Sequence, residues 1–301
     1  MKIDDVKRVL AIGAGTMGHQ IGLLCALHGY AVVIYDTKQE ALEFARKRID
    51  ALADVLVHKK RLPPELKAAV IGRIEFTDNA GEAAREVDVV TESVPEDPVL
   101  KGAIFRKFHA LCPERTIFTT NTSMLIPSLF AHEVGRPEKF LAFHFHDIIK
   151  TDVVDIMPHP GTAPETTELV KAFAEKLGQV VVLLQKENYG YVFNALLSDL
   201  MKSSLALANK NVAAVEDIDR AWMGVMRTDI GPFGIMDSIG LDTVWKIVDY
   251  AAQMSRQKSL AKNAEMLKEY VDAGKLGVKT GEGFYRYPNP QYKQTGFLPN
   301  R

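Results

Sequence analysis

The sequence has few of the residues that mark several classes of protein. It contains two cysteines among 301 residues, Cys25 and Cys112, and they do not form a CxxC pair. A disulfide framework is therefore not expected, and we predict two buried thiols in a cytoplasmic protein. Apolar runs of the roughly 18–20 residues that a membrane helix needs are also missing, so no membrane association is predicted. The charged residues 1–5 lead directly into an apolar stretch, and we expect no signal peptide.

Neither sign of charge is in excess. The chain has 37 Lys and Arg against 38 Asp and Glu, with a formal net charge of −1. This balance argues against a polyanion-binding surface, and nucleic acid is not a predicted partner. A hydrophobic fraction of 47% is typical of globular proteins, and 301 residues are enough for two domains.

Short β-branched runs alternate with helical patterns over the first 185 residues. We expect strands near residues 9–12, 31–35, 74–77, 87–91, 116–120, 140–145, 153–157 and 180–184. Their continuous apolar character predicts a largely parallel sheet that is covered on both faces. Such a βαβ pattern is typical of a Rossmann-type, doubly wound α/β fold.

The pattern changes near Asn188, where strand signals give way to apolar residues at helical spacing. Breaks at Gly231-Pro232, at Gly240 and over residues 274–283 predict three to five helices. We therefore predict a dinucleotide-binding domain over residues 1–187 and an all-helical domain over residues 188–301, which would bind substrate and mediate dimerisation.

A GxGxxG segment follows the first expected strand and opens an expected helix. The motif alone is weak evidence, but here the second strand ends on Asp36, 18 residues past Gly18, as a dinucleotide site requires. Asp36 is placed to accept hydrogen bonds from ribose hydroxyls and to repel a 2′-phosphate, which favours NAD, whereas Lys38 would suit NADP. The residues expected to cradle the pyrophosphate are Gly13, Gly15, Thr16, Met17 and Gly18.

An alcohol dehydrogenase reaction needs a base beside the nicotinamide, and a histidine with a near-neutral pKa suits it. Of eight histidines, His144 and His146 end a strand where an α/β sheet forms its binding crevice. Alternation along a strand puts both imidazoles on one side, so spacing does not choose between them. Asp155 lies in the next apolar run, where an unpaired carboxylate would be costly, and we expect it to orient the base.

The same segment also offers ligand types for a metal. The helical Hx₃H and HExxH spacings are absent and NAD chemistry needs no metal, so no metal site is predicted. The residues that this alternative would use are His144, His146, Asp147 and His159.

Several motifs occur in a fixed order: residues 13–18, Thr91-Glu92-Ser93-Val94-Pro95-Glu96, Asn121-Thr122-Ser123, His144-Phe145, Asn194, Gly231-Pro232-Phe233 and Gly281-Glu282-Gly283-Phe284-Tyr285. With them the chain resembles the 3-hydroxyacyl-CoA dehydrogenase family over nearly its whole length, in particular its 3-hydroxybutyryl-CoA dehydrogenase and diketoreductase-like members. The resemblance implies an NAD-dependent enzyme that interconverts 3-hydroxyacyl-CoA and 3-ketoacyl-CoA, most simply with short acyl chains, and that forms a homodimer.

The resemblance also implies roles for individual residues. His144 matches the catalytic histidine, while Ser123 and Asn194 match the positions that bind the substrate hydroxyl and carbonyl. Taken without the resemblance, Ser123 would be a helix cap and Asn194 a polar residue on a helix surface. The positions that match cofactor contacts are Glu92, Lys101 and Lys279, and Lys59 matches a residue that touches the CoA nucleotide.

One segment departs from the family. Where the family reads His-Phe-Phe-Asn-Pro with a glutamate twelve residues after the histidine, this chain reads His144-Phe145-His146-Asp147-Ile148 and offers Asp155 at eleven. The shorter loop and the shorter carboxylate are expected to compensate, which leaves a working His144–Asp155 pair. Because the rebuilt loop lines the substrate side, a CoA-independent 3-hydroxy acid or diketo ester dehydrogenase is the alternative. A non-catalytic, crystallin-like NAD-binding protein is a third.

Overall fold

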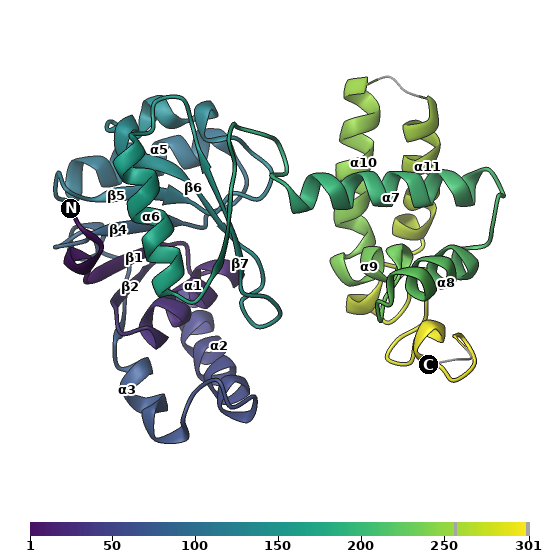
Figure 1. Ribbon diagram of the computed structural model, residues 1–301, viewed down its shortest axis with the longest axis horizontal. Coiled ribbons are helices and arrows are strands. Elements are labelled where there is room, and N and C mark those ends of the chain that lie inside the picture. The colour runs from purple at the N-terminus through teal and green to yellow at the C-terminus, as the bar shows by residue number, and fades with distance from the viewer. Residues whose placement is uncertain (256–257, 299–301) are drawn as a thin grey trace. The chain divides into compact units, whose positions relative to one another are not determined.

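The computed structural model describes residues 1–255 and 258–298 (Figure 1). The chain divides into two compact units, Met1–Asn194 and Ala195–Arg301. The division falls just after α7 (Phe193–Asn209) begins. Each unit is described by itself below.

The first unit is built on one eight-stranded sheet, in the order β3-β2-β1-β4-β5-β6-β7-β8. In the described residues every neighbouring pair is parallel except β6 and β7, which are antiparallel. All the expected strands form, with ends shifted by at most two residues, so the predicted sheet is confirmed. Their bounds are β1 Arg8–Ile12, β2 Ala31–Tyr35, β3 Ile74–Thr77, β4 Val89–Glu92, β5 Ile117–Thr120, β6 Phe140–Phe145, β7 Val153–Pro158 and β8 Val180–Leu183.

Helices cover both faces of this sheet. Val9 and Ala11 point to the face packed by α1 (Thr16–Leu27), α2 (Gln39–His58), α3 (Lys67–Ile71) and α6 (Pro164–Lys176). The intervening Leu10 and Ile12 point to the other face, where α4 (Ala80–Ala83) and α5 (Pro98–Leu111) pack. This alternation along β1 is what a strand buried on both faces requires. The doubly wound Rossmann-type fold is therefore confirmed.

The strand order reverses between β1 and β4. In an open α/β sheet the loops that leave such neighbouring strands run to opposite faces, and a crevice opens at the carboxyl ends of the strands. The loop after β1 carries Gly13, and the loop after β4 carries Ser93. These two loops lie close together, since a Cβ on Gly13 would be 2.8 Å from the Ser93 carbonyl oxygen.

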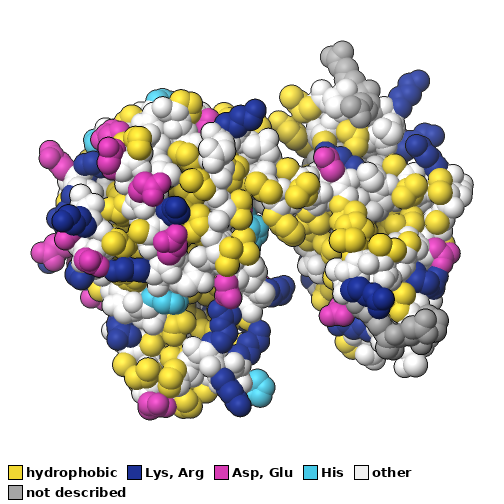
Figure 2. Space-filling model, viewed as in Figure 1, with side chains coloured by type: hydrophobic (Ala, Val, Ile, Leu, Met, Phe, Trp, Pro, Cys, Tyr) yellow, Lys and Arg dark blue, Asp and Glu magenta, His cyan; other side chains and the backbone are white. Residues whose placement is uncertain are grey.

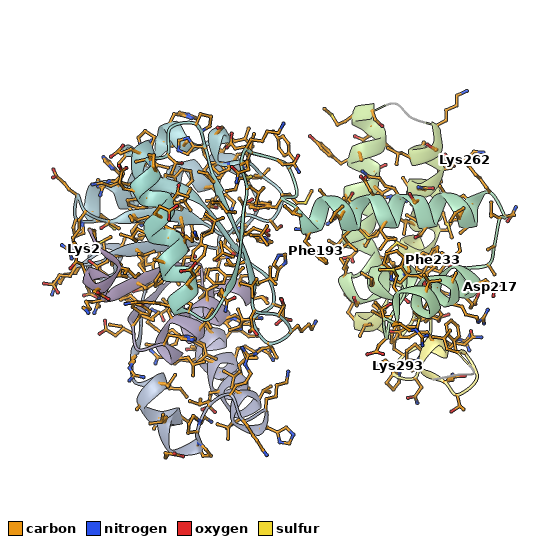
Figure 3. All side chains as sticks on the ribbon, viewed as in Figure 1. Lys2, Phe193, Asp217, Phe233, Lys262 and Lys293 are labelled. Atoms are coloured by element: carbon orange, nitrogen blue, oxygen red, sulfur yellow. The ribbon has the colours of Figure 1, made fainter. Side chains whose placement is uncertain are left out.

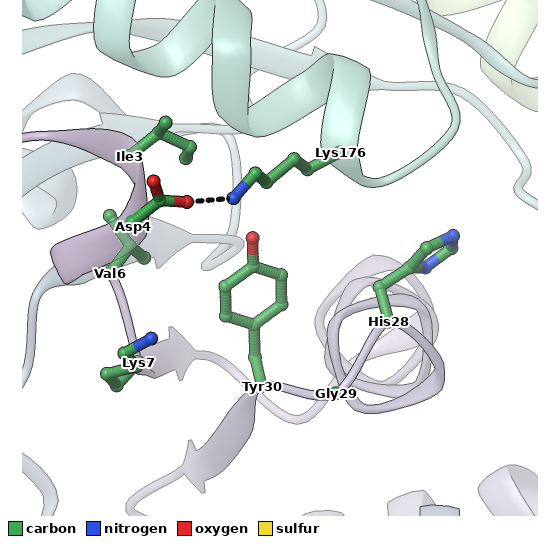
Figure 4. Close-up of a pocket in the computed structure, with 8 residues that line it drawn as sticks. All are labelled: Ile3, Asp4, Val6, Lys7, His28, Gly29, Tyr30 and Lys176. Carbon is green, nitrogen blue, oxygen red and sulfur yellow. Dashed lines mark hydrogen bonds and ion pairs between the residues drawn. The ribbon is translucent and has the colours of Figure 1, made fainter.

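A pocket lies beyond the amino ends of β1 and β2, opposite the carboxyl ends that form the crevice (Figure 4). Its lining residues Lys7 and Tyr30 directly precede β1 and β2, which places the pocket at the amino ends of the strands. Lys176 donates to the Asp4 carboxylate across it, at 2.5 Å between Nζ and Oδ1. The pocket is thus separate from the crevice described above.

The second unit consists of helices, and every strand of the described sheet lies in the first unit. Its core is formed by Met201, Leu205, Phe233, Met236 and Leu267, among others. The all-helical prediction is confirmed. Within the described residues, none of the helices in either unit is long and apolar enough to cross a membrane. After α7 the helices are α8 Val215–Met226, α9 Pro232–Ile239, α10 Leu241–Ser255 and α11 Lys258–Asp272.

Two buried aspartates hold the second unit together. Asp219 of α8 accepts hydrogen bonds from the backbone N–H groups of Phe233 and Gly234, which start α9. Asp237 of α9 accepts from the N–H groups of Phe284 and Tyr285. Burial raises the pKa of both carboxyls, and these hydrogen bonds oppose that shift. The Gly-Pro-Phe and Gly-Glu-Gly-Phe-Tyr motifs are therefore joined through these carboxylates.

Candidate active site

The glycine loop after β1 has the conformation that a dinucleotide needs. Gly13 has φ +98°, a region that favours glycine, and its N–H donates to the Tyr35 carbonyl at 2.8 Å. A Cβ on Gly18 would lie 1.8 Å from the Gly13 carbonyl oxygen, whereas a Cβ on Gly15 would meet nothing within 4 Å. The loop is thus tightly packed at Gly18, whereas the space beside Gly15 is open. The first N–H groups of α1, from Thr16 onward, have no helical partner and suit a pyrophosphate.

Asp36 follows β2 and is tied to this loop. One carboxylate oxygen accepts from the Ala14 N–H at 2.9 Å, and the other accepts from the Lys38 backbone N–H at 3.0 Å. The side chain is half-buried, and its two oxygens keep further lone pairs beyond these hydrogen bonds. The arrangement fits an adenosine ribose at Asp36 with the pyrophosphate on the N-terminus of α1.

We expect Asp36 to enforce NADH over NADPH. A 2′-phosphate beside this carboxylate meets like-charge repulsion, so Asp36→Ala should narrow the ratio of the two kcat/KM values by at least about tenfold. The comparison is made with both cofactors on both proteins, and Asp78→Ala, on an exposed aspartate after β3, is the control. Equal kcat/KM values for the two cofactors in the unmodified protein would contradict the assignment.

Glu92 and Lys101 form an ion pair inside the first unit. The Lys101 ammonium lies 2.7 Å from Glu92 Oε1, and the side chains are 1% and 0% exposed. The ammonium also donates to the Val94 carbonyl at 3.2 Å, and the Thr120 hydroxyl donates to Glu92 at 2.6 Å. Burial raises the pKa of Glu92, and the charge of Lys101 opposes that shift. The buried pair anchors the loop after β4 through the Lys101 bond to the Val94 carbonyl. Direct contact of Glu92 or Lys101 with the cofactor stays a prediction.

The loop after β5 is anchored by Glu96, which sequence reasoning did not select. Its carboxylate accepts from the Thr122 hydroxyl and from the N–H groups of Ser123 and Met124, the latter two at 3.1 Å. Burial would raise the pKa of Glu96, but the Thr122 hydrogen bond and the charge of Lys101 lower it below its usual value. The signal in the sequence was the Thr91–Glu96 motif, of which only Glu92 was given a role.

Ser123 and Asn194 are brought together. The Asn194 side-chain amide donates to the Ser123 carbonyl oxygen at 3.1 Å. This contact joins the loop after β5 to the start of α7, although the two residues are 71 positions apart in the chain. The Ser123 hydroxyl and the Asn194 carboxamide oxygen therefore sit on neighbouring segments of the first unit.

His144 is buried at the end of β6 and bonded to Asp155 on β7. The antiparallel register sets the two residues opposite each other, and His144 Nδ1 lies 3.0 Å from Asp155 Oδ2. His146, two residues on and on the same face, places its Nε2 3.1 Å from the same oxygen. Burial alone would raise the pKa of Asp155, but the hydrogen bonds from the two histidines lower it. One carboxylate oxygen thus serves two imidazoles.

The ionised carboxylate fixes the protonation of both rings. Because it can only accept, His144 must carry a hydrogen on Nδ1 and His146 one on Nε2. A neutral His144 then has its lone pair on Nε2, the atom that a general base needs. The orientation resembles the arrangement by which a carboxylate holds a catalytic imidazole in one tautomer.

Two aromatic side chains, one just before α7 and one at its start, complete the surroundings of the histidines. The Tyr191 ring lies 5.0 Å from that of His144, and the Phe193 ring, at the start of α7 (Figure 3), lies 5.5 Å from that of His146. Tyr191 is buried with φ +57°, and burial raises the pKa of its hydroxyl, which stays protonated. No spacing pattern in the sequence pointed to Tyr191.

The other acidic and histidine residues near this segment have partners elsewhere. Asp147 accepts from the Ile149 N–H at 3.0 Å within its own loop, and Asp152 pairs with Arg61 at 2.8 Å. His159 contacts the Pro137 carbonyl and accepts from the Gly161 N–H. Neither Asp147 nor His159 therefore joins the cluster around Asp155.

The basic segment after α2 packs against the loop that follows His146. Lys59 Nζ donates to the Ile149 carbonyl and Arg61 to the Ile148 carbonyl, each at 3.2 Å. Figure 2 shows Lys and Arg side chains gathered over this end of α2. In the second unit Lys279 pairs with Asp242 at 2.5 Å. Contacts of Lys59 with CoA and of Lys279 with cofactor stay predictions.

A doubly wound sheet, an open glycine loop, an acidic residue at the end of β2 and a buried His–Asp pair together define an NAD-dependent dehydrogenase. Residues 8–188 match the NAD-binding domain of 3-hydroxyacyl-CoA dehydrogenase, and residues 190–287 match its C-terminal domain. The chain belongs to the 3-hydroxyacyl-CoA dehydrogenase family.

Individual relatives agree with this placement. A probable 3-hydroxybutyryl-CoA dehydrogenase from Bacillus subtilis is 32% identical, over 94% of this chain and 98% of the relative. Among solved structures, a diketoreductase is 37% identical with a TM-score of 0.86, covering 94% of this chain and 99% of that one. The (S)-3-hydroxybutyryl-CoA dehydrogenase of Ralstonia eutropha is 27% identical with a TM-score of 0.85, covering 94% and 100%.

Proposed function

We propose that this protein catalyses the reversible, NAD-dependent interconversion of 3-hydroxyacyl-CoA and 3-ketoacyl-CoA, with short acyl chains such as 3-hydroxybutyryl-CoA. The observation that carries the proposal is the buried hydrogen bond between His144 and Asp155, at the edge of the sheet where the dinucleotide loop opens. The family membership of both parts of the chain supports it, as does the name of the Bacillus subtilis relative.

In the oxidation direction four residues of the first unit then have catalytic or binding roles. His144 takes the hydroxyl proton on Nε2, while Asp155 holds the ring and stabilises the imidazolium that forms. Ser123 and Asn194, linked at 3.1 Å, hold the reacting oxygen and the thioester carbonyl. Bound NAD supplies the hydride acceptor. In the reduction direction the imidazolium returns the proton to the new alkoxide.

The oxidation of NADH by acetoacetyl-CoA, followed at 340 nm, tests the proposal. Turnover that is saturable in acetoacetyl-CoA and lost in His144→Gln is the expected result. Tight NADH binding without turnover of any ketone would instead identify a non-catalytic NAD-binding relative.

A second candidate keeps the chemistry and drops CoA. The loop of residues 146–152 differs from the family pattern in length and lacks its asparagine and proline, and the 37% identity with a diketoreductase also favours this candidate. Turnover of free 3-keto acids or diketo esters, without turnover of acetoacetyl-CoA, would establish it.

If CoA is the acyl carrier, the best local site for its phosphates is the exposed basic segment Lys59-Lys60-Arg61. Replacing all three by alanine should raise KM for acetoacetyl-CoA by about tenfold or more, because exposed cations that bind phosphate lose their charge, and should leave the Kd for NADH unchanged. Lys67→Ala, on a lysine paired with Asp50 and Asp54, is the matched control. An unchanged KM would favour the CoA-independent candidate or another path for CoA.

We also propose that the protein is a cytoplasmic homodimer, with residues 188–301 acting as the substrate and dimerisation domain. Large apolar side chains exposed on the second unit, among them Leu196, Val225, Tyr250 and Met254, support an interface there. Light scattering after size exclusion should give twice the mass of the 33.4 kDa chain. A monomer at micromolar concentration would contradict the proposal.

A further inference from the structure

Three ligand-type atoms converge at the end of β6. His144 Nδ1 and His146 Nε2 lie 3.0 and 3.1 Å from Asp155 Oδ2, and the three ligand atoms all lie within 4.8 Å of one another. The reason lies in the strand geometry, because alternation puts both imidazoles on one face and the register sets Asp155 opposite His144. The convergence is therefore built into two paired strands rather than into a mobile loop.

The proposed dehydrogenase reaction accounts for only part of this cluster. It requires one imidazole and one carboxylate, which His144 and Asp155 supply. His146 adds a second donor to an oxygen that is already in use, and its other ring nitrogen, Nδ1, has no hydrogen-bond partner among the described residues. The family pattern has an apolar residue at this position, so the second imidazole is a particular feature of this chain.

The donor set is that of a divalent transition-metal site. Two imidazole nitrogens and a carboxylate oxygen suit Zn²⁺ and its neighbours, and catalytic zinc sites commonly use three protein ligands. Bonds of about 2.1 Å at tetrahedral angles place ligand atoms about 3.4 Å apart. Two of the three pairs already lie close to that separation, at 3.0 and 3.1 Å.

The remaining adjustment falls on the more accessible ring. The His146 side chain is 16% exposed, whereas those of His144 and Asp155 are 6% and 2% exposed. The His146 ring also packs against the Phe193 ring in a T-shaped arrangement, with ring centroids 5.5 Å apart. His146 Nε2 and His144 Nδ1 lie no more than 4.8 Å apart, so a small tilt of the His146 ring sets the third separation. Because His146 is the most exposed of the three side chains, an ion would reach the cluster past this ring.

We propose that His144, His146 and Asp155 bind one divalent transition-metal ion of the Zn²⁺ class, and that the bound ion switches off the dehydrogenase reaction. The second half rests on the proposed function, while the binding does not. This proposal departs from the sequence-based prediction of no metal site, although the NAD chemistry itself still needs no metal.

The inhibition follows from where the ring hydrogen of His144 lies once an ion is bound. The ion replaces the hydrogens on His144 Nδ1 and His146 Nε2, and in each neutral ring the displaced proton returns through solvent to the other nitrogen, so no net proton is lost. His144 then carries its hydrogen on Nε2 and has no lone pair there for the substrate hydroxyl. A hydroxy substrate would keep its proton, and oxidation would stop.

Direct binding tests the site without any substrate. The full-length protein is stripped of metal with a chelator, which is then removed, and is titrated with Co²⁺, read from its visible d–d absorption, and with Zn²⁺ in equilibrium dialysis. We expect one ion per chain, and at least about a hundredfold weaker binding in His146→Gln and in Asp155→Asn, because each removes a ligand of the ion itself. The glutamine keeps an N–H donor for Asp155 and so preserves the hydrogen bond. His132→Gln, on a 72% exposed histidine, is the matched control and should bind as the unmodified protein does.

A second readout tests the switch in the oxidation direction, where His144 must accept a proton. Zn²⁺ should abolish the NAD-dependent oxidation of 3-hydroxybutyryl-CoA by the unmodified protein, EDTA should restore it, and each variant is compared with its own metal-free rate. Absence of stoichiometric binding below 100 µM Zn²⁺, or equal binding in His146→Gln, would overturn the site. Stoichiometric binding with undiminished turnover would overturn the switch.

NADH binding, followed by fluorescence, reports folding of the first unit in every variant. If His146→Gln proved misfolded, the binding measured with Asp155→Asn would still decide whether the site exists. If the protein turned over no substrate at all, the dialysis result would stand apart from the failed function.

Discussion

Asp155→Asn should lower kcat by at least about a hundredfold, because it removes the acceptor that holds His144 in the reactive tautomer. An asparagine amide can donate to His144 Nδ1, which moves the ring hydrogen to Nε2 and leaves no lone pair for the substrate hydroxyl. The Kd for NADH should stay near its original value, since Asp36 and the glycine loop make no hydrogen bond to Asp155. The measurement is steady-state kinetics with acetoacetyl-CoA beside a fluorescence titration with NADH.

Two neighbouring aspartates provide the controls for this result. Asp152 pairs with Arg61 and Asp147 bonds within its own loop, so Asp152→Asn and Asp147→Asn should each keep kcat within about tenfold of the original. A nearly full kcat in Asp155→Asn, with either of these variants inactive, would show that a different carboxylate assists the base.

Asp237→Ala should lower the free energy of unfolding of the second unit by about 3–5 kcal/mol, because it leaves several buried donors without an acceptor. The carboxylate accepts from the N–H groups of Phe284 and Tyr285, both at 2.9 Å, and from the Tyr287 hydroxyl at 3.0 Å. Both tryptophans, Trp222 and Trp245, belong to this unit. Urea denaturation followed by tryptophan fluorescence therefore reports on the second unit specifically.

Asp272→Ala is the matched control in the same unit. Asp272 pairs with Lys268 on the surface of α11, at 2.7 Å with both side chains more than half exposed. Such a pair contributes about 0.3–0.5 kcal/mol, so the midpoint should hardly move. Equal midpoints for Asp237→Ala and Asp272→Ala would contradict the role given to the buried carboxylate.

The sheet could be predicted because its signal is local. A strand that is buried on both faces is a continuous apolar run between turn residues, and the runs at residues 31–35 and 140–145 form strands with the predicted bounds. The dinucleotide loop could be predicted for the same reason, since the glycines, the helix and Asp36 follow one another within 24 residues. The same alternation that defines a strand also put His144 and His146 on one side.

The contacts that complete the site depend on register and on distant segments. Sequence spacing did not choose between His144 and His146, and the structure shows that Asp155 bonds both, because the β6–β7 register brings one oxygen between them. Tyr191 reaches His144 from a segment 47 residues away, through a left-handed backbone position that no periodic pattern signals. The Asn194–Ser123 contact is likewise long-range, at 71 residues.

Because the Glu92–Lys101 ion pair is fully buried, we expect the strength with which it anchors the loop after β4 to be independent of ionic strength. With side chains 0% and 1% exposed, the pair excludes mobile ions as well as water, and added salt does not screen it. The Arg61–Asp152 pair, with side chains 35% and 53% exposed, lies within reach of dissolved ions, so added salt weakens it. In a concentrated electrolyte we therefore expect the ion pair between the basic segment after α2 and the loop after His146 to weaken, while the Glu92–Lys101 pair keeps its strength.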